Sequence, residues 1–292
     1  MFTVKERPDA IETLELRDED AKSMLVLAPA RGGIATRLAL GGKHAFFLDE
    51  STLRDSTKNV RGGNPVLFPQ PGKLEGDAYV HGGRTYAMKQ HGFARTLPWT
   101  VESTRTSDSA EATLVLASND TTRASYPWDF RAEYTYSLRG KKLRITQRFT
   151  NESKSDAHGP MPFGAGFHPY FHVRQAHKRG MVLGTKATRA FDNLSKRTGP
   201  IEPFDLTRDE VDLHLEDHGD GPFTMTWGEQ ALTLRASPEM SRWVVWTLKG
   251  KDFVCVEPWT CAGNALRTSQ GLIELGKGET RELWFEIEST TK

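Results

Sequence analysis

The stretch "FRAEYTYSLRGKKLRITQRFT", residues 130–150, determines the predicted fold. On both of its arms, apolar or aromatic residues alternate with charged or small polar ones, and "RGKK" between the arms is typical of a turn. A period of two places alternate side chains on the same face of a sheet. The stretch therefore predicts an antiparallel hairpin with one buried face.

Similar alternation covers most of the chain. It predicts further strands at 111–118, 223–227, 231–237, 242–248, 253–259 and 281–288, and a single short helix at 207–215, "TRDEVDLHL". The 26 glycines and 15 prolines fall mostly between these runs, as turns require. Many short antiparallel strands bury their apolar faces in a sandwich or a barrel. For 292 residues we expect an all-β fold, a large antiparallel two-sheet β-sandwich that forms one domain over 1–292.

Composition limits the partners. The formal net charge is +1, which favours neither nucleic acid nor an anionic membrane as a partner. No run of about 18 apolar residues predicts a membrane span, and the charged N-terminus lacks the apolar centre of a signal peptide. Two cysteines do not make a disulfide framework. We expect a cytoplasmic protein that is a monomer or a weak homodimer.

The segment 60–77, "VRGGNPVLFPQPGKLEGD", carries three prolines and four glycines. This composition argues against a regular strand and predicts a long loop across the end of a sheet. Long loops in compact domains are often functional. Arg61, Asn64, Gln70 and Lys73 would supply its polar side chains, and a solvated surface loop is the alternative.

Three further stretches carry candidate chemistry. In "KQHGFARTLPW", residues 89–99, we expect an extended strand with His91 and Arg95 on one side; a structural histidine is the alternative. In "PFGAGFHPYFHV", residues 162–173, a regular strand would place His168, Tyr170 and His172 on one face. These histidines match no recognised metal-ligand spacing, so no metal is expected.

In "FVCVEPWTC", residues 253–261, Glu257 ends an apolar strand and shares a face with Phe253 and Cys255. Burial would raise the pKa of this carboxyl toward the range of a useful general base. The alternative is an edge carboxylate in water. The two cysteines are not spaced as a zinc pair, and no local signature supports a cysteine nucleophile.

Together, "RGGNPVLFPQPGKL", "HGFAR", "GFHPYF" and "EPWT" occur in an order that resembles the galactose mutarotase-like superfamily. Within it, the chain is most similar to the aldose 1-epimerase relatives that include the hexose-6-phosphate mutarotases. The resemblance runs from about residue 20 to residue 288. It implies a large antiparallel β-sandwich, in agreement with the periodicity.

The resemblance also implies an activity, that of an isomerase. It would interconvert the α and β anomers of a hexose or a hexose 6-phosphate by opening and closing the ring, without a cofactor. Glu257 would be the general base, His168 the general acid, and His91 would bind and polarise the sugar. A carboxylate and an imidazolium suit this cycle near neutral pH.

The resemblance also implies residues that bind the substrate. Asp212 would hold sugar hydroxyls, with Asp205 as the rival. Arg61 and Arg95 would bind a phosphate. Lys73 and Asn64 are further substrate-binding candidates, but both depart from the phosphate-type pattern, which commonly has arginine at the first position and an apolar residue at the second. On the expected strand, His91 would donate to the oxygen at the reacting end, and Arg95 would lie about 6.5–7 Å further along, near C6 of the sugar.

Two other classes remain open. A non-catalytic carbohydrate-binding β-sandwich could stack sugar rings on tryptophans such as Trp99, Trp128, Trp246 and Trp259, although most tryptophans would be core. A metal-dependent β-barrel enzyme would require a bound metal. A binding module has no need for a buried glutamate that faces two histidines.

Overall fold

The computed structural model describes residues 1–8 and 11–291. Strands form most of it, and all strand ladders are antiparallel in the described part of the chain. The helices are short: α1 (Glu50–Arg54), α2 (Asp120–Arg123), α3 (Ala265–Thr268), and the 3-10 turns η1 (Pro29–Arg31), η2 (Glu75–Asp77) and η3 (Gln175–Gly180). None of the described helices is long and apolar enough to cross a membrane.

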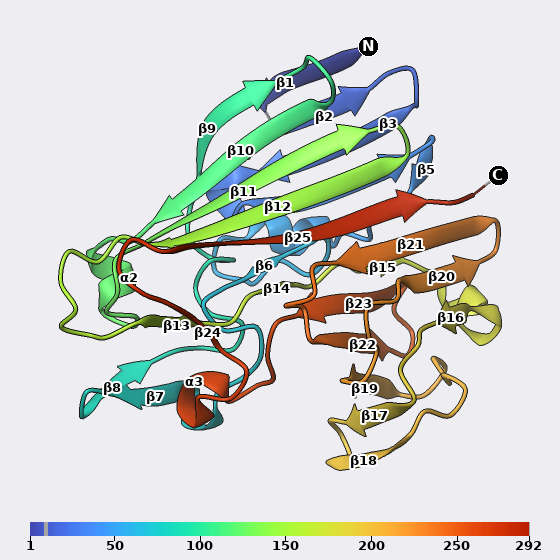
Figure 1. Cartoon of the computed structure of the whole chain (residues 1–292). Coiled ribbons are helices and arrows are strands. Elements are labelled where there is room, and N and C mark those ends of the chain that lie inside the picture. Colours follow the sequence, from blue (N-terminus) through green and yellow to red (C-terminus); the bar gives the residue numbers. More distant parts are fainter. Residues whose placement is uncertain (9–10, 292) are drawn as a thin grey trace.

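Three sheets make up most of the molecule (Figure 1). Sheet I has eight strands, in the order β16 (Val182–Gly184), β20 (Phe223–Trp227), β21 (Gln230–Ala236), β25 (Thr280–Ser289), β12 (Lys142–Asn151), β11 (Phe130–Arg139), β10 (Ala110–Ala117) and β9 (Thr100–Arg105). Sheet II follows the order β18 (Arg197–Pro200), β17 (Arg189–Asp192), β19 (Glu210–Leu215), β22 (Arg242–Leu248), β23 (Phe253–Trp259), β14 (Gly166–Phe167) and β6 (Val66–Leu67), and β15 (Tyr170–His172) pairs with β23.

Smaller sheets complete the fold. Sheet III has the order β1 (Phe2–Pro8), β2 (Glu12–Asp18), β3 (Ser23–Ala28), β4 (Ile34–Leu40) and β5 (Lys43–His44). Two ribbons of two strands pair β13 (Met161–Phe163) with β24 (Ile273–Leu275), and β7 (Ala78–His81) with β8 (Arg84–Ala87). The prediction of a large antiparallel β-sandwich is confirmed, with more sheets than the two expected.

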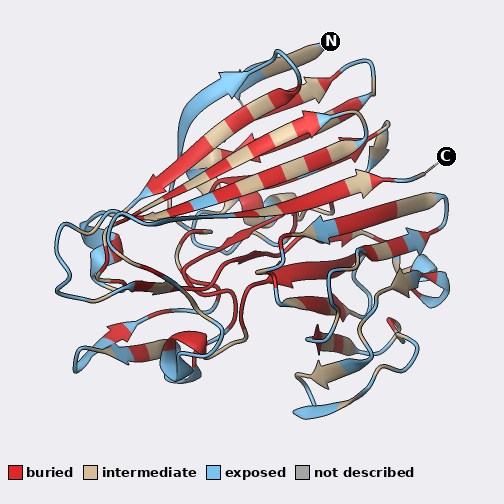
Figure 2. Cartoon of the chain, viewed as in Figure 1, coloured by how far each residue is buried: buried red, intermediate tan, exposed pale blue. Residues whose placement is uncertain are grey.

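The hairpin predicted over 130–150 is β11 and β12, with Leu138 opposite Leu143 in the ladder next to the turn. Alternate residues of both strands are buried, which Figure 2 shows as alternating bands along them. The buried row of β11 is Phe130, Ala132, Tyr134, Tyr136 and Leu138. The period of two in the sequence therefore identified the core face of sheet I.

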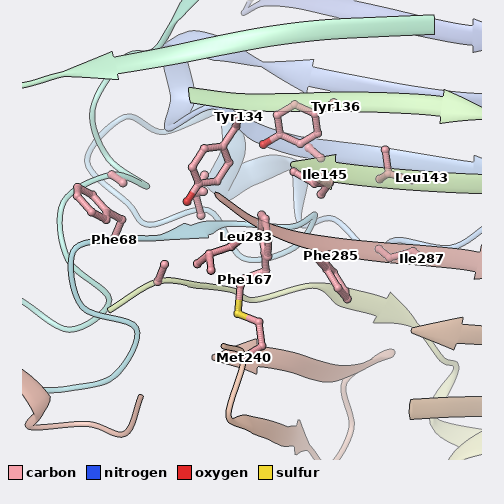
Figure 3. Packing of buried hydrophobic residues seen from close by; sticks show 14 of the residues in the cluster. Phe68, Tyr134, Tyr136, Leu143, Ile145, Phe167, Met240, Leu283, Phe285 and Ile287 are labelled. Atoms are coloured by element: carbon pink, nitrogen blue, oxygen red, sulfur yellow. The ribbon is translucent and has the colours of Figure 1, made fainter. Parts of the chain in front are cut away.

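Buried side chains of sheet I face Phe167 of sheet II in the core (Figure 3), and residues of sheet III belong to the same core cluster. The Phe285 ring of β25 packs against Phe167 of β14, with 5.3 Å between ring centroids, and against Trp243 of β22 at 6.2 Å. Toward sheet III, the Tyr136 hydroxyl donates to the Gly33 carbonyl at 2.9 Å. Buried aromatic side chains of this size dominate core energetics, so this packing holds sheet II in place.

One local prediction is wrong, and a second is incomplete. The segment 207–215 contains no helix: β19 pairs with β17 on one side and with β22 on the other, which places Asp212 opposite Trp246. The segment 60–77 is mostly loop, as predicted, but Val66 and Leu67 form β6 and pair with β14. In both cases, cross-strand partners far along the chain decide the local structure.

The expected strand over "KQHGFAR" is also absent. His91 and Gly92 adopt left-handed φ angles of 69° and 70°, and the His91 amide donates to the Gly72 carbonyl at 2.9 Å. A Cβ atom at Gly92 would lie 2.1 Å from the Phe68 carbonyl oxygen, so only glycine fits this turn. The turn, not a strand, sets the relative positions of His91 and Arg95.

Candidate active site

Sheet II carries a pocket of about 830 Å³, within the range of small-molecule sites. Seven residues singled out from the sequence line it, and they come from the 60–77 loop, the "HGFAR" turn, β19, β23 and the residues just before β15. They are Arg61, Lys73, His91, Arg95, His168, Asp212 and Glu257. The fold therefore gathers segments up to about 200 residues apart into one cavity.

Glu257 is placed by the alternation of β23. Val254 and Val256 point into the main core, whereas Glu257 points into the pocket and is only 1% exposed. One carboxylate oxygen, Oε2, accepts a hydrogen bond from the Trp259 indole at 3.1 Å. Burial, and then the nearby Asp212 carboxylate, raise the pKa of Glu257 well above its ordinary value.

His168 faces Glu257 from the residue that precedes Pro169 and β15. Its Nε2 lies 3.4 Å from Glu257 Oε1, and its ring stacks on Tyr170 at 4.7 Å with an interplanar angle of 9°. Its Nδ1 is buried with no hydrogen-bond partner among the described residues. Burial, then His91 and Arg95, lower the pKa of His168 well below its ordinary value.

Removal from water thus disfavours the charged form of each group in the His168–Glu257 pair, the imidazolium of His168 and the carboxylate of Glu257. A proton bound by the pair can reside on the carboxyl or on the imidazole, and transfer between them leaves the net charge of the pair unchanged. Groups held this way exchange protons readily with a bound substrate. The arrangement suits acid–base chemistry on two neighbouring atoms.

His91 is oriented by the backbone. Its Nδ1 donates to the Pro71 carbonyl, because a carbonyl oxygen can only accept. Burial, then Arg95, lower the pKa of His91 to about 3, so the ring is neutral. In this neutral tautomer Nε2 carries the lone pair and offers an acceptor to the pocket, whereas a donor was expected at His91 from the sequence.

Asp212 is held by two neighbours. Its Oδ2 accepts from the Asn193 amide at 2.7 Å, and its Oδ1 lies 3.2 Å from His214 Nε2. His214 also lines the pocket, where its ring meets the Trp259 ring edge-on at 5.4 Å between centroids. The sequence reasoning missed His214; its spacing of two from Asp212 on a strand would have placed both on one face.

Some of the cations that line the pocket make no salt bridge with a described residue. Among residues 1–8 and 11–291, no salt bridge reaches Arg61, Lys73 or Arg95. Arg95 donates from Nη2 to the Gln90 carbonyl at 3.1 Å, while its Nε is buried without a partner. No carboxylate pairs with Arg95 in the described part of the chain, so this guanidinium is not neutralised by an ion pair.

Some predicted residues lie elsewhere. Asn64 is buried outside the pocket lining, because its backbone bridges to Ala35 of β4, and Asp205 is exposed and accepts from Thr207. Of the tryptophans, Trp246 and Trp259 line the pocket, whereas Trp99 and Trp128 belong to the core. Tyr170, expected on one face with His168, also lines the pocket. Other lining residues that the sequence reasoning did not select are Asn193, Lys196, Glu210, Glu216 and Arg242.

Solved structures of other proteins are similar to this chain in fold, and one of them is also similar in sequence. The Slr1438 protein from Synechocystis sp. PCC 6803 is 33% identical, with a TM-score of 0.92 and full coverage of both chains. A galactose mutarotase-like protein from Clostridium acetobutylicum shares the fold at a TM-score of 0.82 and 16% identity, with 100% of this chain and 99% of that chain covered.

A curated relative from Escherichia coli K12, described as "Putative glucose-6-phosphate 1-epimerase", is 28% identical over 181 residues, which are 61% of this chain and 55% of the relative. The chain spans about half the length of the curated relatives it matches. The sequence model of the family described as aldose 1-epimerase matches residues 15–288. The chain therefore belongs to the aldose 1-epimerase family, a family of isomerases.

Proposed function

We propose that the protein is a mutarotase that interconverts the α and β anomers of a hexose 6-phosphate. The observation that carries the proposal is the buried His168–Glu257 pair, with 3.4 Å between Nε2 and Oε1. Arg61, Lys73 and Arg95 line the same pocket, and none of them makes a salt bridge with a described residue. Membership of the aldose 1-epimerase family supports the reaction class.

The chemistry follows from the pair. In a cyclic sugar, the anomeric hydroxyl oxygen and the ring oxygen are both bonded to C1 and so lie side by side. When the proton of the pair resides on His168, Glu257 is a carboxylate and removes the proton of the hydroxyl while His168 protonates the ring oxygen, and the C1–ring oxygen bond breaks. Rotation about C1–C2 then presents the other face of the aldehyde, and ring closure uses the same two groups in reversed roles.

Other pocket residues position the sugar. His91 accepts from a sugar hydroxyl through Nε2, since its Nδ1 is committed to the Pro71 carbonyl. Asp212, fixed by Asn193 and His214, accepts from a second hydroxyl. Trp246 and Trp259 supply aromatic surface for the apolar face of the ring.

The phosphate has a cationic subsite. Arg61 and Lys73 from the 60–77 loop and Arg95 from the "HGFAR" turn line one pocket and are free of carboxylates in the described part of the chain. Unpaired cations repel one another, and a dianion removes this repulsion. An arginine fork binds phosphate in bidentate fashion, which makes Arg95, with its partly unsatisfied guanidinium, the central residue of this subsite.

The test compares several sugars as substrates, each as an equilibrium mixture of its two anomers. Exchange between the α and β anomeric protons is followed by NMR for glucose, galactose and their 6-phosphates, with and without the protein. The proposal predicts accelerated exchange for all, and the largest kcat/KM for a 6-phosphate. Measurable sugar binding without any acceleration would instead support a carbohydrate-binding protein.

A further inference from the structure

Cys255 is a buried nucleophile that the proposed reaction does not use. It precedes Glu257 by two residues on β23 and so shares its face, between Tyr170 of β15 and Trp246 of β22 in the ladder. Its side chain is fully buried and does not line the pocket surface. The thiol therefore lies directly behind the acid–base pair.

The three side chains converge. One ligand atom each from His168, Cys255 and Glu257 lie within 4.8 Å of one another, and all three residues are buried. The 3.4 Å between His168 Nε2 and Glu257 Oε1 equals the edge of a tetrahedron with bonds of about 2.1 Å, the length of zinc–nitrogen and zinc–oxygen bonds. His168 also has an unpartnered Nδ1, so its ring is not locked by a second hydrogen bond.

We propose that His168, Cys255 and Glu257 form a binding site for a thiophilic divalent cation such as Zn²⁺ or Cd²⁺, and that this cation inhibits the enzyme. Imidazole, thiolate and carboxylate form a donor set that such ions accept, with a fourth position left open toward the pocket. The bound ion occupies both proton-transfer groups at once. Inhibition therefore follows from the geometry of the site.

Charge alone would not attract the ion. Lys178 and Arg61 lie near Cys255, and Arg95 lies near His168, closely enough to oppose a cation, whereas Asp212 near Glu257 favours one. The sulfur–metal bond must provide the selectivity, so hard cations such as Mg²⁺ do not bind here. On binding, the thiol S–H bond breaks, its proton leaves to solvent, and the sulfur lone pair forms the bond to the metal without any change in oxidation state.

The experiment titrates Cd²⁺ into the metal-free full chain and follows the ultraviolet charge-transfer band of the cadmium–thiolate bond, with Mg²⁺ as the control ion. Cys255→Ser is expected to abolish the band, and Cys261→Ser, which removes the other buried thiol, is expected to retain it. A band that persists in Cys255→Ser, or that is lost in Cys261→Ser, would overturn the proposal. This readout does not depend on the proposed function.

Two further arms complete the test. Cd²⁺ should inhibit anomer exchange by the wild type. Cys255→Ser should keep the basal activity but need at least about tenfold more Cd²⁺ for half-inhibition, which corresponds to a loss of about 1.4 kcal/mol in the free energy of Cd²⁺ binding. If Cys255→Ser fails to fold, Glu257→Gln, which keeps both thiols, should weaken the cadmium band titration by about tenfold or more. Cd²⁺ that binds equally well to Glu257→Gln, or that leaves the activity of the wild type unchanged, would contradict the site.

Discussion

Replacing Arg95 with methionine should weaken turnover of the phosphorylated sugar and spare the neutral one. Methionine keeps much of the apolar stem of Arg95 and removes the guanidinium, which has a buried Nε without a partner and one hydrogen bond, from Nη2 to the Gln90 carbonyl. A hydrogen bond to a charged group contributes roughly 1.5–3 kcal/mol. This range corresponds to a loss of about 10- to 150-fold in kcat/KM for glucose 6-phosphate.

The pH of the assay matters for this comparison. Arg95 lowers the pKa of Glu257 and the pKa of His168. Its removal raises both pKa values, so the pH–rate profile of Arg95→Met should move to higher pH for both sugars. Rates are therefore compared at the pH optimum of each variant, which separates the loss of the phosphate contact from the shift of the profile.

The assay is anomer exchange by NMR with glucose and glucose 6-phosphate, and Arg242→Met is the matched control. Arg242 lines the same pocket but already pairs with Glu216, with 3.0 Å between Nη1 and Oε1. Its removal should affect the two sugars equally. Equal losses for both sugars in Arg95→Met, or a wild type indifferent to the phosphate, would refute the phosphate subsite.

Three other expectations follow from buried titratable groups. His168→Asn should lower kcat by about 10²- to 10⁴-fold and retain sugar binding, as measured by calorimetry; a near-normal kcat would exclude His168 as the acid. Arg95 and Arg61 lower the pKa of His168, so a bound dianion that offsets their charge should raise this pKa. The limb of the pH–rate profile that reports His168 should therefore lie at higher pH with glucose 6-phosphate than with glucose. Superimposable profiles for the two sugars would contradict this. Burial lowers the pKa of Lys178 from 10.5 to about 8, which destabilises the fold by about 3 kcal/mol below pH 8, a cost that disappears as pH rises toward 10.5. In urea unfolding, the wild type should therefore gain stability relative to Lys178→Met between about pH 8 and pH 10.5, the folded and unfolded pKa values, and a constant difference would show that Lys178 does not titrate in the fold.

The parts of the fold that the sequence predicted are those decided by neighbours along the chain. The hairpin β11–β12 depends on alternation and on a short turn, and both are visible in residues 130–150. The apolar run before Glu257 left two possibilities, a buried carboxyl or an edge carboxylate in water, and on β23 the side chain is buried. The family resemblance then related these local features to a reaction.

The parts that were missed depend on distant contacts. The "HGFAR" turn follows from the close approach of Gly92 to Phe68, which no local pattern reveals. The segment 207–215 begins with acidic residues typical of a helix start, but its hydrogen bonds go to β17 and β22. Asn64 was a candidate for substrate binding because it lies on a loop with polar residues, but its backbone β-bridge to Ala35 holds it outside the pocket lining.

The proposed roles of the site residues center on Glu257 as the general base, and one measurement tests this most directly. Anomer exchange of glucose 6-phosphate is recorded by NMR for the wild type and for Glu257→Gln, with circular dichroism to show that the variant is folded. Glutamine preserves the size of the side chain and can still pair with Trp259, but it cannot take a proton. We predict acceleration by the wild type and a loss of about 10²- to 10⁴-fold in the variant. Near-normal exchange by folded Glu257→Gln would contradict the mechanism.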